Sequence, residues 1–245
     1  MSKGAVLILG AKSDIGLAVA HRFAAEGHPV QLAARNAQSL EVTRTDMALR
    51  HDVPVSIHDF DALALKTHES FIDTLPELPR IVVCAVGLMG EQSENEADMD
   101  LAVRVMRSNY EGPASIFGHL ANRFEARGSG HLVGISSVAG LRGRATNYIY
   151  GSAKAGFTAY LSGLRNRLAK EGVQVLTVLP GFVATSMTED MDLPKKLTAQ
   201  PEEVADAIEK AVRKRRNIIY VRPIWWLIMT IICSIPERIF KGMKI

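Results

Sequence analysis

The pentapeptide Tyr150-Gly-Ser-Ala-Lys154 sets a phenol and an ammonium four residues apart. On a helix this spacing brings both side chains onto one face. An isolated tyrosine, with a pKa of about 10, is a poor acid–base catalyst near neutral pH, but a fixed cation beside it lowers that pKa. The pair therefore predicts a proton donor, Tyr150, activated by Lys154, although the spacing also occurs by chance. Ser137, after the apolar run 131–135, adds a hydroxyl at the end of an expected strand.

The N-terminal part of the chain has the pattern of a dinucleotide site. An apolar run at 5–9 leads into the turn Gly10-Ala-Lys-Ser-Asp-Ile-Gly16. A helical pattern over 15–26 and a second apolar run at 30–34 follow. A strand, a glycine turn and a helix in this order are what the phosphates of a dinucleotide require, although the glycines alone would also fit an ordinary turn.

The rest of the chain alternates apolar runs with helical patterns. The runs are short and often continuous, as in parallel strands covered on both faces, and they lie at 5–9, 29–34, 53–57, 80–85, 131–136, 173–179 and 218–221. The helical stretches lie at 15–26, 38–50, 63–75, 98–127, 148–170 and 201–214. This alternation predicts an α/β fold, a Rossmann-like doubly wound parallel sheet of about seven strands. We expect one domain at 1–222, with a substrate lid at 181–200, and a hydrophobic C-terminal segment at 223–245.

Composition limits the classes of function. The 245 residues are 47% hydrophobic and 22% charged, as in a soluble globular core. A net charge of +3, without basic residues interleaved with aromatic ones, argues against nucleic acid, and seven histidines without ligand spacing argue against a metal. Cys84 and Cys233 lie in separate apolar runs and are expected to be buried thiols in a reducing compartment. The start of the chain has no signal-peptide pattern, so we expect a cytoplasmic protein.

Over residues 3–221 the chain resembles the short-chain dehydrogenase/reductase family. The markers appear in the family's order: Gly10 to Gly16, Asp59, Ala85-Val-Gly87, Asn109, Ser137, Tyr150, Lys154 and Pro180-Gly-Phe-Val-Ala-Thr185. The resemblance implies hydride transfer between a nicotinamide cofactor and a carbonyl or alcohol, with Tyr150 as acid or base. It also implies that Ser137 holds the substrate oxygen, that Lys154 binds the nicotinamide ribose, and that Asn109 holds a water linking Lys154 to solvent.

The same resemblance implies a cofactor site. Gly10 permits the tight turn, and Gly16 lets the backbone pass close to a pyrophosphate at the helix N-terminus. Asp59 is expected to meet the adenine and Thr185 the nicotinamide amide. The full expected set is Gly10, Lys12, Ser13, Ile15, Gly16, Arg35, Asp59, Phe60, Ala85, Gly87, Tyr150, Lys154, Pro180, Gly181, Val183 and Thr185.

The end of the second apolar run bears on which cofactor binds. Arg35 follows Ala34 where an enzyme that prefers NAD would carry an acid. A guanidinium can pair bidentately with a 2′-phosphate, so NADP(H) is favoured over NAD(H). Lys12 would add positive charge near that phosphate. The alternative for both side chains is exposure to solvent.

Three positions depart from the family pattern. Leu9 stands where threonine is usual, and Asp14 stands where the middle glycine is usual. Asp14 could instead cap the following helix. Cys84-Ala85 replaces a pair of asparagines, which puts in doubt the hydrogen bonds that those side chains make.

The C-terminal segment is more apolar than a surface tail should be. Residues 224–235 would form a helix of about 18 Å, too short for a hydrocarbon core of about 30 Å. Trp225 and Trp226 suit a membrane interface, and the bases expected to flank the segment are Arg213, Lys214, Arg215, Arg216, Arg222, Arg238, Lys241 and Lys244. We therefore expect peripheral contact with the cytoplasmic face of an anionic membrane. The alternative is a segment that covers the substrate cleft or a neighbouring subunit.

The substrate class is implied by the resemblance. The apolar segment and the Gly-Ala-x-Ser-Asp-Ile-Gly turn are similar to those of the branch that contains decaprenylphosphoryl keto-pentose reductases. This favours a hydrophobic or lipid-linked carbonyl, with a small soluble or acyl-chain ketone as the alternative. A homo-oligomer is a family expectation. The rival function is a non-catalytic dinucleotide sensor or scaffold of the same fold.

Overall fold

The architecture is a parallel sheet between two helical layers. The computed structural model describes residues 3–189 and 191–243. Within them seven parallel strands pair in the order β3-β2-β1-β4-β5-β6-β9. The strands are β1 (Val6–Leu9), β2 (Val30–Ala34), β3 (Val55–Asp59), β4 (Ile81–Cys84), β5 (Gly130–Ile135), β6 (Val173–Pro180) and β9 (Ile218–Val221). The predicted doubly wound sheet is confirmed.

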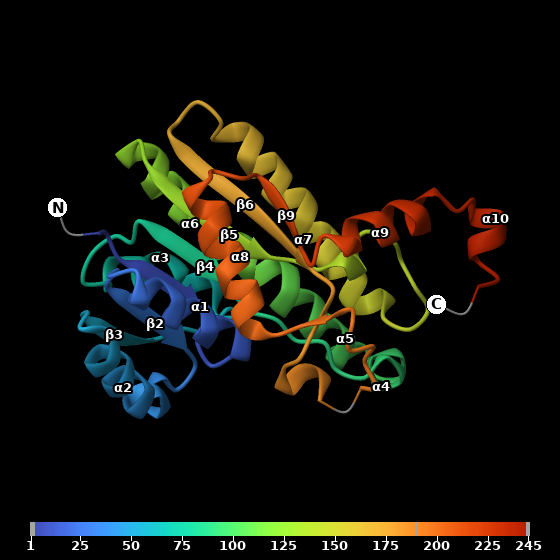
Figure 1. The fold of residues 1–245 in the computed structure, drawn as a ribbon, viewed down its shortest axis with the longest axis horizontal. Helices are drawn as coiled ribbons and strands as arrows, with labels where there is room; N and C mark the ends of the chain where they lie inside the picture. The colour runs from blue at the N-terminus through green and yellow to red at the C-terminus, as the bar shows by residue number, and fades with distance from the viewer. Residues whose placement is uncertain (1–2, 190, 244–245) are drawn as a thin grey trace.

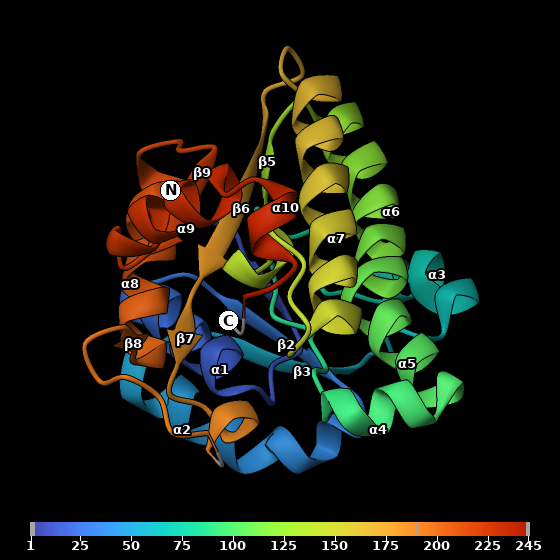
Figure 2. The same cartoon turned by 90° about the vertical axis from the view of Figure 1, so that its right-hand side faces the viewer.

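Helices cover both faces of this sheet (Figures 1 and 2). They are α1 (Asp14–Ala25), α2 (Glu41–His51), α3 (His68–Asp73), α4 (Gln92–Ala97), α5 (Met99–Met106), α6 (Gly112–Arg127), α7 (Tyr148–Arg167), α8 (Pro201–Arg213), α9 (Ile224–Ser234) and α10 (Glu237–Phe240). Figure 2 shows α1 and α8 on one side of the sheet and α6 and α7 on the other. Alternate side chains of β1 point to opposite faces of the sheet. Val6 and Ile8 belong to the hydrophobic core between the sheet and α1, whereas Leu7 and Leu9 belong to the core between the sheet and α6.

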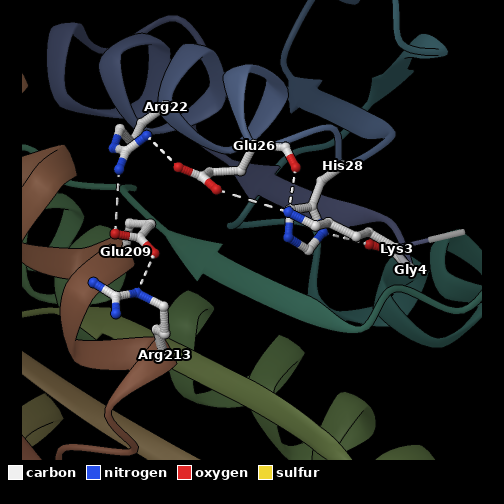
Figure 3. Close-up of polar contacts among 7 residues, drawn as sticks. All are labelled: Lys3, Gly4, Arg22, Glu26, His28, Glu209 and Arg213. Atoms are coloured by element: carbon white, nitrogen blue, oxygen red, sulfur yellow. Dashed lines mark hydrogen bonds and ion pairs between the residues drawn. The ribbon is translucent and has the colours of Figure 1, made fainter. Parts of the chain in front are cut away.

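A buried carboxylate ties α8 to α1 (Figure 3). Glu209 of α8 accepts a hydrogen bond from Arg22 of α1 at 3.3 Å and another from Arg213 at 3.1 Å. Arg22 also pairs with Glu26 one turn later on its own helix, at 2.8 Å. Only a tenth of the Glu209 side chain is exposed, so its charge needs these two partners.

The start of α1 corrects one sequence expectation. Ser13, and not Asp14, caps the helix, because the Gly16 N–H donates to Ser13 Oγ at 3.1 Å. Asp14 is the first helical residue. Its carboxylate accepts hydrogen bonds from the Ser186 N–H at 2.8 Å and the Ser186 hydroxyl at 3.0 Å. The glycine turn and the segment predicted as a lid are therefore joined.

The long helix predicted over 98–127 is confirmed as an unbroken helical run from Met99 to Arg127, with a π turn inside it. It consists of α5, a π turn at Arg107–Glu111, and α6. Gly112, the first residue of α6, packs closely against residue 62, since a Cβ there would lie 2.3 Å from the Ala62 carbonyl oxygen. Such π insertions are frequent at functional sites, and Asn109 lies inside this one.

The segment predicted as a substrate lid at 181–200 is anchored at both ends. The short strands β7 (Phe182–Val183) and β8 (Thr198–Ala199) pair in parallel, with a 3₁₀ turn at Ser186–Thr188 between them. Arg222 donates to the carbonyl oxygens of Lys195 and Lys196 and pairs with a glutamate of α8. Residue 190 lies outside the described residues.

The C-terminal segment begins with a short apolar helix, α9, as predicted. No helix in the described ranges has both the length and the apolar character needed to span a bilayer. Trp225 is 5% exposed, so the expectation that it lies at a membrane interface is wrong. Its indole occupies the space of a side chain at Gly181, since a Cβ there would lie 1.9 Å from the indole ring. The indole Nε1–H donates to the Leu197 carbonyl oxygen at 3.2 Å. Trp226 is 57% exposed.

Two further expectations about side chains near the C-terminus are wrong. Cys84 is buried as predicted, but Cys233 is exposed, because α9 buries only one side of its circumference. The bases at 213–216 precede β9 and are separated from α9 by the length of that strand. Arg222 is held by the lid contacts described above. Of the predicted basic set, Arg238 and Lys241 follow α9 directly, and residue 244 lies outside the described residues.

Candidate active site

The direction in which successive strands are added to the sheet changes between β1 and β4. From β1 it proceeds outward through β2 to β3, and it then returns to place β4 on the other side of β1. Loops leaving the carboxyl ends of two such strands diverge and leave a crevice that suits a ligand. A cleft of about 510 Å³ lies here, within the usual range for small-molecule sites. Its walls include the predicted residues Gly10, Lys12, Ser13, Arg35, Phe60, Ala85 and Gly87.

The glycine turn is fixed by close backbone approach. Gly10 has φ +86°, and a Cβ there would lie 2.9 Å from backbone atoms of Ala85 and Val86. A Cβ on Gly16 would lie 2.6 Å from the Gly10 carbonyl oxygen. Only glycine satisfies both positions. The turn therefore brings the N-terminus of α1, with its partial positive charge, to the edge of the cleft.

The end of the cleft that lies next to the carboxyl end of β2 differs in part from the prediction. Arg35 and Lys12 line it as expected. Asp59 does not belong to the described cleft wall, because its carboxylate accepts a hydrogen bond from the Ala37 N–H at 2.8 Å. The acid that does line the cleft is Asp61. A contact between Asp59 and adenine therefore stays a prediction.

Sequence reasoning missed Arg104 and Ser108, which line the cleft from α5 and the π turn. Their four-residue spacing would place them on one helical face. That signal was hidden, because a continuous helix over 98–127 would not reveal which face meets the cleft. The π turn after α5 alters the face that the following residues present.

Ser137, Tyr150 and Lys154 converge on a second, adjoining pocket of about 150 Å³. Ser137 follows β5, and the other two lie one turn apart on α7. The Lys154 ammonium lies 5.7 Å from the centre of the Tyr150 ring and donates to the Ile135 carbonyl oxygen at 3.0 Å. Ser136 fastens the helix to the strand end, because its hydroxyl donates to the Lys154 carbonyl oxygen at 3.0 Å. The predicted grouping of these three side chains is present.

The protonation of the pair differs from the sequence expectation. Burial raises the pKa of Tyr150 to about 12, and the hydrogen bond from Ser137 offsets only part of that rise. Burial also lowers the pKa of Lys154 to about 8. The expected lowering of the Tyr150 pKa by Lys154 is therefore wrong for this structure, because loss of hydration outweighs a cation bonded to a backbone carbonyl. Tyr150 is held as a neutral phenol at pH 7.

Asn109 is fully buried beside the pocket of Tyr150. Its Nδ2–H donates to the carbonyl oxygens of Leu88 at 2.5 Å and Val105 at 2.8 Å, so it joins the loop after β4 to α5. A Cβ on Gly87 would lie 3.3 Å from Asn109 Oδ1 and 3.7 Å from Lys154 Nζ. The two side chains thus meet at Gly87. The role of Asn109 in holding a water stays a prediction.

The lid contributes the opposite wall. The predicted residues Ile15, Pro180, Gly181, Val183 and Thr185 line the same pocket as Tyr150. Apolar side chains of Met89, Phe182 and Met187 complete much of it. Two polar residues that the sequence analysis did not single out, Arg144 and Asn147, also line it. Their position in a loop without periodicity gave no signal.

The fold and this arrangement agree with the comparisons to known proteins. A family model described as "short chain dehydrogenase" matches residues 4–196. An uncharacterized oxidoreductase of Mycobacterium tuberculosis is 37% identical, covering 88% of this chain and 87% of the relative. An uncharacterized oxidoreductase of Streptomyces coelicolor is 33% identical over 98% of this chain and 96% of the relative. The chain belongs to the short-chain dehydrogenase family and is an oxidoreductase of that family.

Solved structures extend the likeness of the fold. A short chain dehydrogenase/reductase family protein is 26% identical with a TM-score of 0.80, covering 90% of this chain and 97% of that one. A short-chain dehydrogenase from Sphingobium yanoikuyae in complex with NADPH is 24% identical with a TM-score of 0.81, covering 96% and 97%. The fold is therefore that of the family across almost the whole chain.

Replacing Lys154 by Met should change the pH dependence of stability. Below pH 8 both the folded and the unfolded chain carry the Lys154 proton, so the cost of burying the charge is present in full. Between about pH 8 and 10.5 the folded chain has lost that proton while the unfolded chain keeps it, so this group makes the free energy of unfolding rise with pH. The stability of the Met variant relative to the wild type should fall by on the order of 2 kcal/mol from pH 7 to pH 10.

Urea unfolding at several pH values measures this difference. Comparing the two proteins at each pH cancels the other titrating groups and the hydrogen bond to Ile135, which the variant lacks throughout. Parallel stability curves for the two proteins would show that Lys154 has an ordinary pKa.

Proposed function

We propose that this chain transfers a hydride between NADP(H) and a carbonyl or alcohol, with Tyr150 as the acid–base residue. The observation that carries the proposal is the convergence of Ser137, Tyr150 and Lys154 on a pocket that adjoins the glycine-walled cleft. A nicotinamide dinucleotide, when bound, supplies or accepts the hydride. The backbone approach at Gly10 and Gly16 leaves room for its phosphates at the N-terminus of α1.

The residues of the pocket handle the proton. In reduction Tyr150 donates its phenolic proton to the carbonyl oxygen as negative charge develops there. Its raised pKa keeps that proton available at neutral pH. Ser137 holds the substrate oxygen by a hydrogen bond, and the Lys154 ammonium stabilises the phenolate that remains. In oxidation the same Tyr150 acts as the base.

The preference for NADP(H) rests on charge at the end of the cleft next to β2. Arg35 and Lys12 line the wall next to Ala34, at the end of β2. A 2′-phosphate would pair with these cations. Two solved structures with the fold of this chain, the Sphingobium enzyme and an actinorhodin polyketide ketoreductase, are complexes with NADPH.

The substrate that fits the pocket is a hydrophobic or lipid-linked carbonyl compound. Methionines from the loop after β4 and from the lid, with Phe182, supply the apolar wall around Tyr150. The buried side of α9 packs behind that wall, since Trp225 contacts Phe182 with ring centres 5.2 Å apart. This packing supports the interpretation in which the C-terminal segment covers the substrate cleft.

The other side of α9 supports contact with a lipid surface. Trp226, Leu227 and Ile231 are exposed on one helix. Arg238 and Lys241 follow on exposed positions, and Figure 1 shows α10 at the extremity of the molecule. An apolar face beside cations suits the interface of an anionic bilayer. A second copy of the chain is the alternative cover for this face.

Replacing Tyr150 by Phe should reduce the rate of ketone reduction at least about a hundredfold, because it removes the positioned proton donor. The measurement is NADPH oxidation with a panel of hydrophobic ketones. Tyr148→Phe is the matched control, since Tyr148 is exposed two residues earlier and should retain full activity. Full activity of the Tyr150 variant would reject the role. Binding of NADPH by the wild type without turnover of any ketone would favour the non-catalytic sensor.

Replacing Arg35 by Ala should weaken NADPH binding by roughly tenfold or more and leave NADH binding nearly unchanged, because only NADPH carries the 2′-phosphate. Nucleotide fluorescence titrations measure both affinities. Arg50→Ala removes the same charge from an exposed position on α2 and should change neither. Equal loss for the two nucleotides would contradict the assignment of Arg35 to the phosphate.

Changing Trp226, Leu227 and Ile231 together to Ser should reduce binding to anionic liposomes by about tenfold or more, because it removes apolar surface from the outer side of α9. Cosedimentation at low salt measures the bound fraction. Val42→Ser with Leu49→Ser, on α2, removes exposed apolar surface elsewhere and serves as control. No binding by the wild type would reject the membrane proposal. A dimer abolished by the triple change would assign the face to a second copy.

A further inference from the structure

The pocket around Tyr150 has an unbalanced charge. Two cationic side chains, Lys154 and Arg144, line it. In the described part of the chain no aspartate or glutamate lines it with them. Lys154 is accounted for by the acid–base chemistry and donates to the Ile135 carbonyl oxygen. Arg144 takes no part in that chemistry.

Arg144 lies in the loop between Ser137 and α7, six residues before Tyr150. Its Nε is buried, and among residues 3–189 and 191–243 it has no hydrogen-bond partner. No ion pair to its guanidinium occurs within those ranges either. Burial lowers the pKa of Arg144, with no carboxylate acting against it. An arginine nevertheless keeps its charge in a protein, so an uncompensated guanidinium is held at the pocket wall.

A neighbouring arginine shows the contrast. Arg142, two residues earlier, pairs with Glu237 at 2.6 Å and lies over the ring of Phe240, 4.1 Å from its centre. Its positive charge is therefore used within the fold. Arg144 has no such role in the described structure. A guanidinium that the fold does not neutralise, in a pocket with apolar walls, is suited to an oxyanion brought by the ligand.

Asn147 adds a second unused polar group to the same wall. Its Oδ1 is buried without a partner in the described ranges. The residue also lines the pocket. Its backbone carbonyl oxygen, in contrast to Oδ1, has a partner, because it accepts a hydrogen bond from the Gly151 N–H at 2.8 Å. The loop before α7 therefore presents two polar groups, Arg144 Nε and Asn147 Oδ1, that have no hydrogen-bond partner in the part of the chain that the structure describes. Buried groups of this kind normally find partners.

The phosphates of the cofactor are not the expected partner of Arg144. They are expected at the glycine turn, in the cleft that also holds Lys12 and Arg35, and the described wall of that cleft does not include Arg144. Arg144 instead lines the pocket of Tyr150, where the nicotinamide end of the cofactor, which carries no anionic group, is expected beside the carbonyl compound. An anion that pairs with Arg144 in this pocket would therefore belong to the substrate.

We propose that Arg144 binds an oxyanion of the substrate, a carboxylate or a phosphate ester, and that it selects acidic carbonyl compounds over neutral ones of the same shape. This inference rests on the proposed carbonyl chemistry of the same pocket. Asn147 Oδ1 accepts a hydrogen bond from a neighbouring donor group of that substrate. The substrate thus combines an apolar part with one acidic group.

The test uses matched ketones that differ only in charge. Methyl-ketone carboxylic acids of four to ten carbons are compared with their methyl esters, and ketones carrying a phosphate monoester with the corresponding alcohols. For each pair, kcat/KM with NADPH and the affinity for the protein–NADP⁺ complex are measured. The wild type should prefer at least one class of acid over its neutral partner by about tenfold or more.

Arg144→Gln should abolish that preference, so that the ratio of kcat/KM for the acid to kcat/KM for its neutral partner falls to about one. Arg144→Lys should retain part of it, because it keeps the charge but not the planar fork. Arg167→Gln removes the same charge from the far end of α7 and should keep the preference intact. The affinity of each variant for NADPH should be unchanged.

The outcomes separate this inference from the proposed function. Turnover of neutral ketones by the wild type without any preference for acids would overturn the role of Arg144 and leave the reductase proposal standing. Loss of NADPH affinity in Arg144→Gln, without a change in preference, would assign Arg144 to the cofactor and overturn it as well. Acids that bind more tightly than esters through Arg144, with no turnover of either, would support the oxyanion site and reject the reductase.

Discussion

The buried ammonium of Lys154 is the constraint on which the site depends. A charge in such surroundings is costly unless it is fixed by good partners, and here it donates to the Ile135 carbonyl oxygen at the end of β5. That hydrogen bond joins α7 to the end of β5 and helps to fix the position and rotation of the helix relative to the sheet. Ser136 repeats the attachment from the strand side through the Lys154 backbone. Tyr150, one turn earlier on the same helix, is positioned as a consequence.

The same burial determines how the pair can work. Loss of hydration moves the two pKa values toward the neutral forms, with Tyr150 raised and Lys154 lowered. The phenol therefore keeps its proton near neutral pH, as the proposed donation to a substrate oxygen requires. In that proposal the ammonium stabilises the phenolate that remains, because an anion nearby favours the charged form of the lysine. The two pKa shifts suit the proposed proton donor better than a phenolate held before the reaction.

Sequence reasoning located most of the fold and the central group of the site, because these depend on local patterns. Short apolar runs identify parallel strands, and four-residue spacing places Tyr150 and Lys154 together. The errors lie where tertiary contacts decide. The burial of Trp225, unlike its neighbour Trp226, follows from the absence of a side chain on Gly181. Gly181 is not near Trp225 in the sequence, so no periodicity could reveal this contact.

Asp14 shows how a departure from a family pattern can carry structural information. A glycine at this position would leave the turn flexible, whereas Asp14 places a carboxylate in the first turn of α1, where the helix dipole favours it. The same carboxylate accepts two hydrogen bonds from Ser186, across 172 residues of sequence. The glycine turn and the lid are thereby joined beside the site. Because Trp225 packs against Gly181 and donates to the Leu197 carbonyl oxygen, the lid is held from both the N-terminal turn and the C-terminal helix.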